Sequence, residues 1–307
     1  MNILNILNEI EKVDGEIYER SSARRKAMEN FFNVGKKVSL AALPLGLSTM
    51  FQKAYGQTTT TNDVAIDSLN LLLALTYMKF QFYNNALTAT PTPVPVGDKP
   101  IITILRDQEQ AHINLLTKTI IDLKGTPRPI MPYANFDYTR VNANVNANYG
   151  TFLRTAVVLE DLSERAYKGQ LISLMGTSAL AVVARIQTVE ARHSAQLRQM
   201  VNKLQIATLK YMRPWVSIRR SDVDGTNTLP ITGNDSMIGA LNPIYDIDAG
   251  LLNRETKTVQ GGIELVGING NVDITVGPAS ESFDEYLLTP AVKTAANLFI
   301  KAAFQLK

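Results

Sequence analysis

The sequence predicts a mainly α-helical protein built around a four-helix bundle, and three observations lead to this prediction. Four long stretches between residues 62 and 205 repeat apolar side chains at helical spacing. A passage of about twenty residues, rich in proline and asparagine, separates the second stretch from the third, and this length suits a crossover between the two ends of a bundle. The second and fourth stretches carry the same Glu-x-x-His step.

Composition narrows the class of protein. The chain has 307 residues, of which 45% are hydrophobic and 19% charged, so it has enough apolar material for a globular core. It contains no cysteine, which excludes disulfides, iron–sulfur clusters and thiolate zinc sites. The net charge is only +3 and the basic residues are scattered, so we expect no nucleic-acid partner.

The first expected helix begins at Asn62 or Asp63, either of which can cap it, and ends near Leu87. Its apolar residues cover most of its circumference, so we expect it to be largely buried, and it contains no glutamate. The second helix is expected over residues 99–124 and ends at Gly125.

The third helix is expected over residues 149–175 and the fourth over residues 177–204. Glu160 lies among apolar residues of the third helix, where an unpaired carboxylate would be costly. It therefore needs a partner, which is either a metal ion or an arginine such as Arg165 or Arg192.

The two Glu-x-x-His steps, Glu109 to His112 and Glu190 to His193, include both histidines of the chain. A helix places residues i and i+3 on one face, so each step directs a carboxylate and an imidazole the same way. In a protein without cysteine, these are the side chains that would hold a metal ion. The alternative for His112 is a core histidine bonded to a backbone carbonyl.

At this point the residues resemble the ferritin-like family, in particular its bacterial branch related to plant desiccation-associated proteins. The resemblance covers about residues 63–205, and its motifs are specific in combination although each alone is weak. Besides the two Glu-x-x-His steps, the matching residues are Leu69-Asn70, Phe82-Tyr83, Glu160-Asp161 and Ala166-Tyr167-Lys168-Gly169.

The resemblance implies a site for two metal ions. Glu109 and Glu190 would bridge the ions, and Glu160, His112 and His193 would be terminal ligands. The implied ions are iron or manganese, one or two per chain, or none. The implied function is metal binding with oxygen or peroxide chemistry at a degenerate site. The alternative is a non-catalytic structural or stress-associated protein that has lost full di-metal binding.

One departure from the family pattern concerns the first helix. Thr76 stands where the family has a metal-binding glutamate, and Lys79 follows one turn later. Asp67 lies about 13.5 Å away along the helix, too far to replace that glutamate. The Glu160 and His193 half should therefore be the better-supplied one, and we expect Lys79 to fill the vacancy near His112 as a fixed cation. Three outcomes remain open: an asymmetric two-metal site, a single-metal site, or a metal-free salt-bridge cluster.

Residues 1–61 form either an N-terminal helical extension or an export signal. Residues 1–20 have the spacing of an amphipathic helix, and Arg24-Arg25 with the apolar run 38–50 loosely resembles a twin-arginine signal. Export would place the protein in the periplasm or cell envelope, and the alternative is the cytoplasm. The apolar run is too short to span a membrane.

Residues 206–307 should form a C-terminal region of loops, a β-hairpin and a closing helix. The hairpin is expected over residues 261–277 around Asn269-Gly270, and the helix over residues 290–304. Strands added to a bundle need a cover, so we expect a homo-oligomer or an assembly with another ferritin-like chain. The final helix lacks a dense basic face, so membrane association is not expected.

Overall fold

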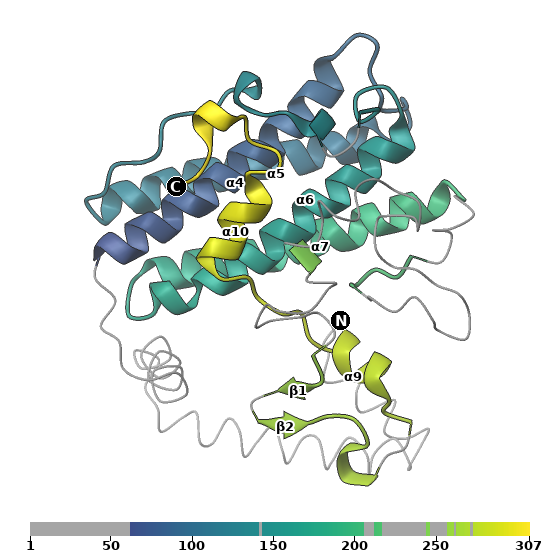
Figure 1. Cartoon of the computed structure of the whole chain (residues 1–307). Coiled ribbons are helices and arrows are strands. Elements are labelled where there is room, and N and C mark those ends of the chain that lie inside the picture. The colour runs from purple at the N-terminus through teal and green to yellow at the C-terminus, as the bar shows by residue number, and fades with distance from the viewer. Residues whose placement is uncertain are drawn as a thin grey trace, which may run out of the picture. The chain divides into compact units, whose positions relative to one another are not determined.

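A computed structural model describes residues 62–140, 143–205, 212–216, 244–245, 257–260, 262–270 and 273–307. Four long helices dominate it (Figure 1): α4 (Asn62–Thr88), α5 (Lys99–Asp122), α6 (Tyr149–Gln170) and α7 (Ala179–Lys203). These bounds lie within a few residues of the predicted ones, except that the third helix ends at Gln170 and a short 3₁₀ turn, Ile172–Leu174, follows. The predicted mainly helical bundle is confirmed.

The bundle is built from two helix pairs. Helix α4 packs chiefly on α5 and α6 chiefly on α7, and α4 also contacts α6. Helix α4 is buried around most of its circumference, as its apolar composition predicts, with Leu69, Leu72 and Met78 fully buried. Its burial matters for the site because it brings a charged residue of this helix, described below, into the centre of the bundle.

The long crossover from α5 to α6 is anchored at both ends and in the middle. The amide of Gly125 donates to the carbonyl of Ile120 at the end of α5, and the side chain of Asn148 accepts from the amide of Thr151 at the start of α6. Between these ends, the hydroxyl of Tyr138 donates to the carbonyl of Met78 in α4 at 2.6 Å. The crossover is thus part of the packed bundle.

The C-terminal region contains the predicted hairpin and closing helix, although the hairpin lies elsewhere. Strand β1 (Val259–Gln260) pairs antiparallel with β2 (Ile263–Glu264), and Gly262 takes a positive φ of 83° in the turn. Asn269-Gly270, where the turn was predicted, instead closes a 3₁₀ turn. Both of these residues also have positive φ, so the sequence offered two turns with left-handed backbone and the prediction chose the wrong one.

The chain after the hairpin forms α9 (Val276–Glu281) and α10 (Thr289–Ala296), so the predicted closing helix over residues 290–304 is too long. Phe299 and Ile300 are buried as expected, but Phe299 lies in the turn that follows α10 and Ile300 lies beyond it. Ile300 forms a β-bridge with Phe136 of the crossover, and this pairing replaces further helical turns.

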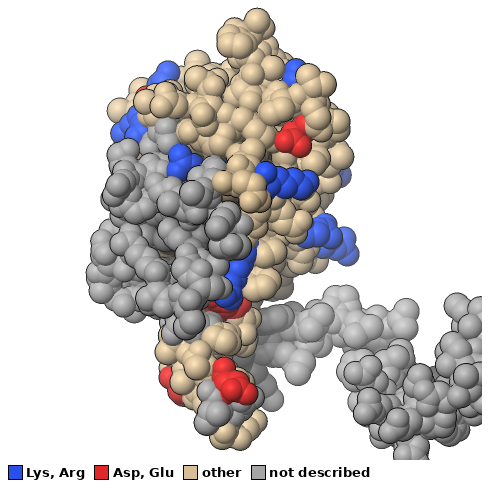
Figure 2. All heavy atoms as spheres, turned by 90° about the vertical axis from the view of Figure 1, so that its right-hand side faces the viewer, with Lys and Arg blue, Asp and Glu red and all other residues tan. Residues whose placement is uncertain are grey.

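The predicted N-terminal extension or export signal, residues 1–61, lies outside the described residues. Among the described helices, none combines the length and the apolarity needed to cross a membrane. On the face drawn in Figure 2, Lys and Arg side chains lie in several separate places among uncharged residues.

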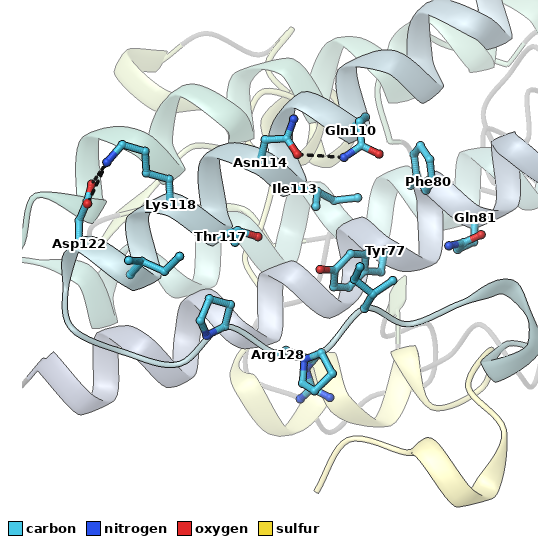
Figure 3. Close-up of a pocket in the computed structure, with 14 residues that line it drawn as sticks. Tyr77, Phe80, Gln81, Gln110, Ile113, Asn114, Thr117, Lys118, Asp122 and Arg128 are labelled. Carbon is cyan, nitrogen blue, oxygen red and sulfur yellow. Dashed lines mark hydrogen bonds and ion pairs between the residues drawn. The ribbon is translucent and has the colours of Figure 1, made fainter.

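A groove of about 750 Å³ lies between α4, α5 and the start of the crossover (Figure 3). Its lining is mostly apolar and includes Tyr77, Ile113, Pro127 and Pro129. None of the five predicted metal ligands lines it. The chemistry predicted from the sequence therefore lies elsewhere, inside the bundle.

The segment before α10 packs directly on α6 at Gly169. A Cβ atom on Gly169 would lie 1.9 Å from the carbonyl oxygen of Leu287, and the amide of Leu287 donates to the carbonyl of Arg165. Gly169→Ala should therefore lower the free energy of unfolding by about 1–3 kcal/mol, because the backbone of Leu287 must move. Urea denaturation checks this value, and an unchanged midpoint would show that the contact is not close in solution.

Candidate metal centre

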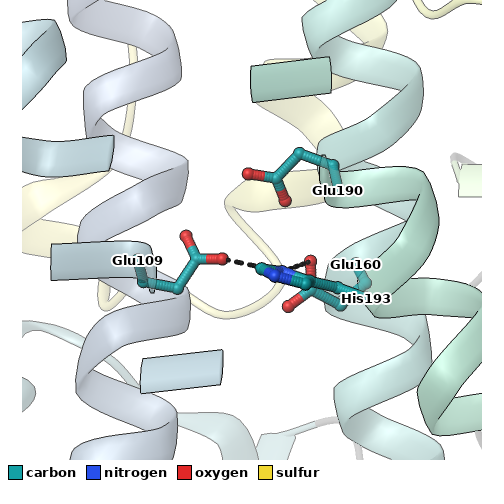
Figure 4. A group of neighbouring side chains, drawn as sticks. All are labelled: Glu109, Glu160, Glu190 and His193. Atoms are coloured by element: carbon teal, nitrogen blue, oxygen red, sulfur yellow. Dashed lines mark ion pairs between the residues drawn. The ribbon is translucent and has the colours of Figure 1, made fainter. Parts of the chain in front are cut away.

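The structure brings all five predicted ligand residues together in the centre of the bundle. Glu109 and His112 come from α5, Glu160 from α6, and Glu190 and His193 from α7. The three glutamates are fully buried, and the histidines are 7% and 3% exposed. Figure 4 shows the three carboxylates converging with His193 between the helices. Four of these residues, Glu109, Glu160, Glu190 and His193, form a buried group that could hold a metal ion.

Lys79 of α4 lies inside this cluster and is itself fully buried. Its ammonium group donates to Glu109 Oε1 and to Glu160 Oε2, both at 2.9 Å, and to Glu190 Oε2. Each of the three carboxylates thus contributes one oxygen to the same ammonium group. A cation with fixed position already stands at the point where these oxygens meet.

His193 lies on the side of the cluster that Lys79 occupies. Its Nδ1 is 3.2 Å from Glu109 Oε1 and 3.6 Å from Glu160 Oε2, two of the oxygens that bind the ammonium group. One ligand atom from each of Glu109, Glu160, Glu190 and His193 lies within 4.8 Å of the others, as a metal site requires. We call this group the Lys79 side, because a metal ion could use these oxygens only if Lys79 left.

His112 faces the other oxygens of two carboxylates. Its Nδ1 is 3.2 Å from Glu190 Oε1 and 3.7 Å from Glu109 Oε2. These three atoms are buried and none of them makes a hydrogen bond. We call them the His112 side, which offers one imidazole nitrogen and two carboxylate oxygens.

The distances on the His112 side suit a metal ion. Imidazole nitrogen and carboxylate oxygen bind first-row metals at about 2.1 Å. Two such atoms are therefore about 3.0 Å apart when the angle at the metal is about 90° and about 3.6 Å apart when it is about 120°. The measured separations from His112 Nδ1, 3.2 Å and 3.7 Å, are close to these values. These two separations are compatible with one ion beside His112, whereas the group of Glu109, Glu160, Glu190 and His193 shares carboxylate oxygens with the Lys79 ammonium group.

Lys79 therefore lies on the opposite side from the one expected. The vacancy left by Thr76 was predicted near His112, and Lys79 was expected to fill it. Instead Thr76 directs its hydroxyl to the carbonyl of Leu72 and to Tyr167, and Lys79 contacts Glu160. One turn of helix and a long flexible side chain separate the two positions, and spacing alone does not decide which carboxylates a lysine reaches.

Glu160 has partners other than the arginines considered from the sequence. Besides Lys79, the hydroxyl of Tyr83 donates to its Oε1 at 2.5 Å. Arg165 donates instead to backbone carbonyls, including that of Glu285 at 2.8 Å. Both oxygens of Glu160 are thus occupied, so this residue belongs to the Lys79 side alone.

Charge in the cluster shifts every pKa within it. Burial by itself would lower the pKa of Lys79, but the three carboxylates raise it well above its usual value. Burial raises the pKa of the glutamates, yet Lys79 holds the pKa of Glu109 well below its usual value and that of Glu160 at about 2. Glu190 keeps a raised pKa, through burial and the neighbouring Glu109.

The neighbouring carboxylates also raise the pKa values of both histidines when no metal ion is present. Burial opposes protonation, but Glu109 and Glu190 raise the pKa of His112 to about 9. Burial is likewise outweighed at His193, where Glu160 and Glu109 raise the pKa to about 10. Without an ion, both rings are imidazolium at neutral pH, so that three cationic side chains face the three glutamates.

The metal-free protein should lose stability as the pH rises. Each histidine has a folded-state pKa above its unfolded value, so its contribution is complete below about pH 6.5. It is lost as the pH passes about 9 for His112 and about 10 for His193. Between about pH 6.5 and these folded-state pKa values, the free energy of unfolding should fall by about 1.4 kcal/mol per pH unit for each histidine. Urea denaturation of chelator-treated protein measures it, and a flat or rising profile would contradict the imidazolium state.

Sequence reasoning missed one neighbour of the site, Gln108. Gln108 Oε1 is 2.6 Å from His193 Nε2. Gln108 precedes His112 by four residues, so the i, i+4 spacing of a helix was the signal that could have placed it near the cluster.

The fold and the cluster define a class of protein: a four-helix bundle with a long crossover and a buried carboxylate–histidine centre. A comparison with protein-family models matches residues 64–203 to the ferritin-like domain. These residues therefore form a ferritin-like domain. A comparison with curated proteins gave no match.

Proposed function

We propose that this ferritin-like protein binds one divalent metal ion per chain, iron or manganese, on the His112 side. The observation that carries the proposal is the division of the carboxylate oxygens. Lys79 binds one oxygen of Glu109 and of Glu190, and leaves the other oxygen of each facing His112 Nδ1 without a hydrogen bond. Lys79 then stands in for the second ion of a di-metal site.

The donor set favours iron or manganese among the divalent ions. Two carboxylates and one imidazole are hard and borderline ligands, and the chain has no cysteine to offer a soft one. A bound ion of this kind supplies Lewis acidity and open coordination positions. Chemistry that requires two adjacent ions is not part of this proposal, because Lys79 occupies the second position.

A second candidate function is a metal-free structural or stress-associated protein. The supporting observation is the charge balance: Lys79 and the two imidazolium rings match the three carboxylates without any ion. In that case the cluster would specify how the four helices pack and would bind nothing.

Two histidine variants distinguish the proposals. Purified, chelator-treated protein is titrated with Mn²⁺ or, without oxygen, Fe²⁺, and the bound metal is counted by elemental analysis. We expect one ion per chain in the wild type and in His193→Ala, because His193 lies on the Lys79 side. His112→Ala removes the nitrogen ligand and should weaken binding by about 10–100-fold.

Each other outcome contradicts the proposal in its own way. No bound metal in the wild type would favour the metal-free candidate. Two ions per chain would show that Lys79 does not block the second position. Loss of binding in His193→Ala but not in His112→Ala would place the ion on the Lys79 side. Circular dichroism of both variants confirms that they are folded.

A further inference from the structure

The cluster is closed to solvent on most sides, and the histidines form its outer wall. The side chains of Lys79 and of the three glutamates are 0% exposed. Those of His112 and His193 are 9% and 4% exposed. The two rings stand side by side between α5 and α7, with centroids 6.1 Å apart and planes 26° apart. The two imidazoles are therefore the side chains of the cluster that lie nearest to solvent.

Gln108 forms a hydrogen bond with the ring of His193 on its solvent-facing side. It is an exposed residue of α5, and its Oε1 lies 2.6 Å from Nε2 of His193 on α7. An amide oxygen can only accept, so Nε2 of His193 carries the proton in this contact. The opposite ring nitrogen, Nδ1, is thereby directed at Glu109 and Glu160.

We propose that Gln108 of α5 is a positioning residue whose hydrogen bond holds the ring of His193 of α7 in place and so controls the exchange of the metal ion with solvent. We call this hydrogen bond the latch. This inference rests on the proposed function for its ion. While the hydrogen bond is made, the ring of His193 covers the cluster. When it is broken, only the contacts of Nδ1 with Glu109 and Glu160 hold the ring, so the ring turns outward more often and exposes the cluster. The side-chain oxygen of Gln108 contacts His193, which lies on the Lys79 side and is not one of the proposed ligands of the ion.

The contribution of one hydrogen bond sets the size of the effect. A typical hydrogen bond contributes about 1 kcal/mol, which corresponds to a population change of about fivefold to tenfold. Gln108→Ala should therefore speed both association and dissociation of Mn²⁺ about fivefold to tenfold, and leave the affinity nearly unchanged. The rates are measured by stopped flow, with the metal bound from solution and then captured by a chelator.

Two further variants separate positioning from a general effect of mutation. Gln108→Glu keeps an acceptor oxygen for Nε2 of His193 and should keep the wild-type rate of dissociation. Gln110→Ala is the matched control: Gln110 lies on the same helix, and its amide donates to Asn114 at 3.0 Å (Figure 3). This control should also exchange the ion at the wild-type rate.

A spectroscopic readout in metal-free protein tests the latch without the ion. In ¹⁵N-histidine NMR, the Nε2 proton of His193 should be protected from exchange in the wild type and in Gln108→Glu, and unprotected in Gln108→Ala. Unchanged protection in Gln108→Ala, or equal acceleration of metal exchange by Gln110→Ala, would overturn the inference. If the wild type binds no metal but the protection is lost in Gln108→Ala, the latch exists and the proposed function has failed.

Discussion

Lys79→Ala should lower the free energy of unfolding of the metal-free protein by about 3–5 kcal/mol and raise its metal capacity from one ion per chain to two. The loss of stability follows because three fully buried carboxylates lose the ammonium group they share. The gain of an ion follows because the variant frees ligand atoms of Glu109, Glu160, Glu190 and His193 that lie within 4.8 Å of one another.

The two effects are linked, so they can be checked together. Added Mn²⁺ should restore much of the lost stability of Lys79→Ala, because an ion that binds only the folded state stabilises it. Lys118→Ala is the control: this exposed lysine on α5 pairs with Asp122, and its loss should cost at most about 0.5 kcal/mol. If Lys79→Ala were as stable as this control, or still bound one ion, Lys79 would not be the internal cation of the cluster.

Asp161→Ala should also lower the free energy of unfolding by about 3–5 kcal/mol, but without any change in metal binding. Asp161 directly follows Glu160 and is 2% exposed. Its carboxylate accepts hydrogen bonds from Arg198 and Ser194 of α7 and from the hydroxyl of Tyr245 at 2.6 Å. Removing it leaves the fully buried Arg198 without its carboxylate, which is the costly way to break a buried ion pair.

Asp161 and Glu160 are neighbours in the sequence but have separate roles: Asp161 holds α6 on α7, and Glu160 belongs to the metal centre. A matched variant tests this difference. Asp107→Ala removes an exposed carboxylate that pairs with Arg106, and it should change stability by less than about 0.5 kcal/mol. Urea denaturation gives the stabilities, and calorimetric titration with Mn²⁺ gives the affinity. A folded Asp161→Ala protein with weakened metal binding would show that this residue supports the His112 side as well as the helix packing.

The helices and the ligand residues could be predicted from the sequence because they depend on local spacing. Apolar residues at helical intervals fixed α4 to α7 within a few residues, except at the end of α6. The Glu-x-x-His steps placed carboxylate and imidazole on one helix face. The convergence of Glu160 with them came from the family resemblance, since nothing in the spacing of one helix tells which other helix it faces.

The position of the Lys79 ammonium group could not be predicted in the same way. A lysine side chain reaches several ångströms from its helix, and its contacts depend on the packing of α4 against α5, α6 and α7 together. The hairpin was misplaced for a similar reason, because both Gly262 and Asn269-Gly270 permit a tight turn and only tertiary packing selects one. Local spacing and the family resemblance therefore predicted the ligand residues, and packing determined which carboxylate oxygens face His112.

Manganese anomalous scattering from crystals soaked in Mn²⁺ tests the central claim most directly. The account predicts a single strong peak per chain, bounded by His112 Nδ1, Glu109 Oε2 and Glu190 Oε1, with the Lys79 ammonium group still bound to Glu160. Two peaks per chain, or one peak among Glu109, Glu160, Glu190 and His193 with Lys79 displaced, would contradict it.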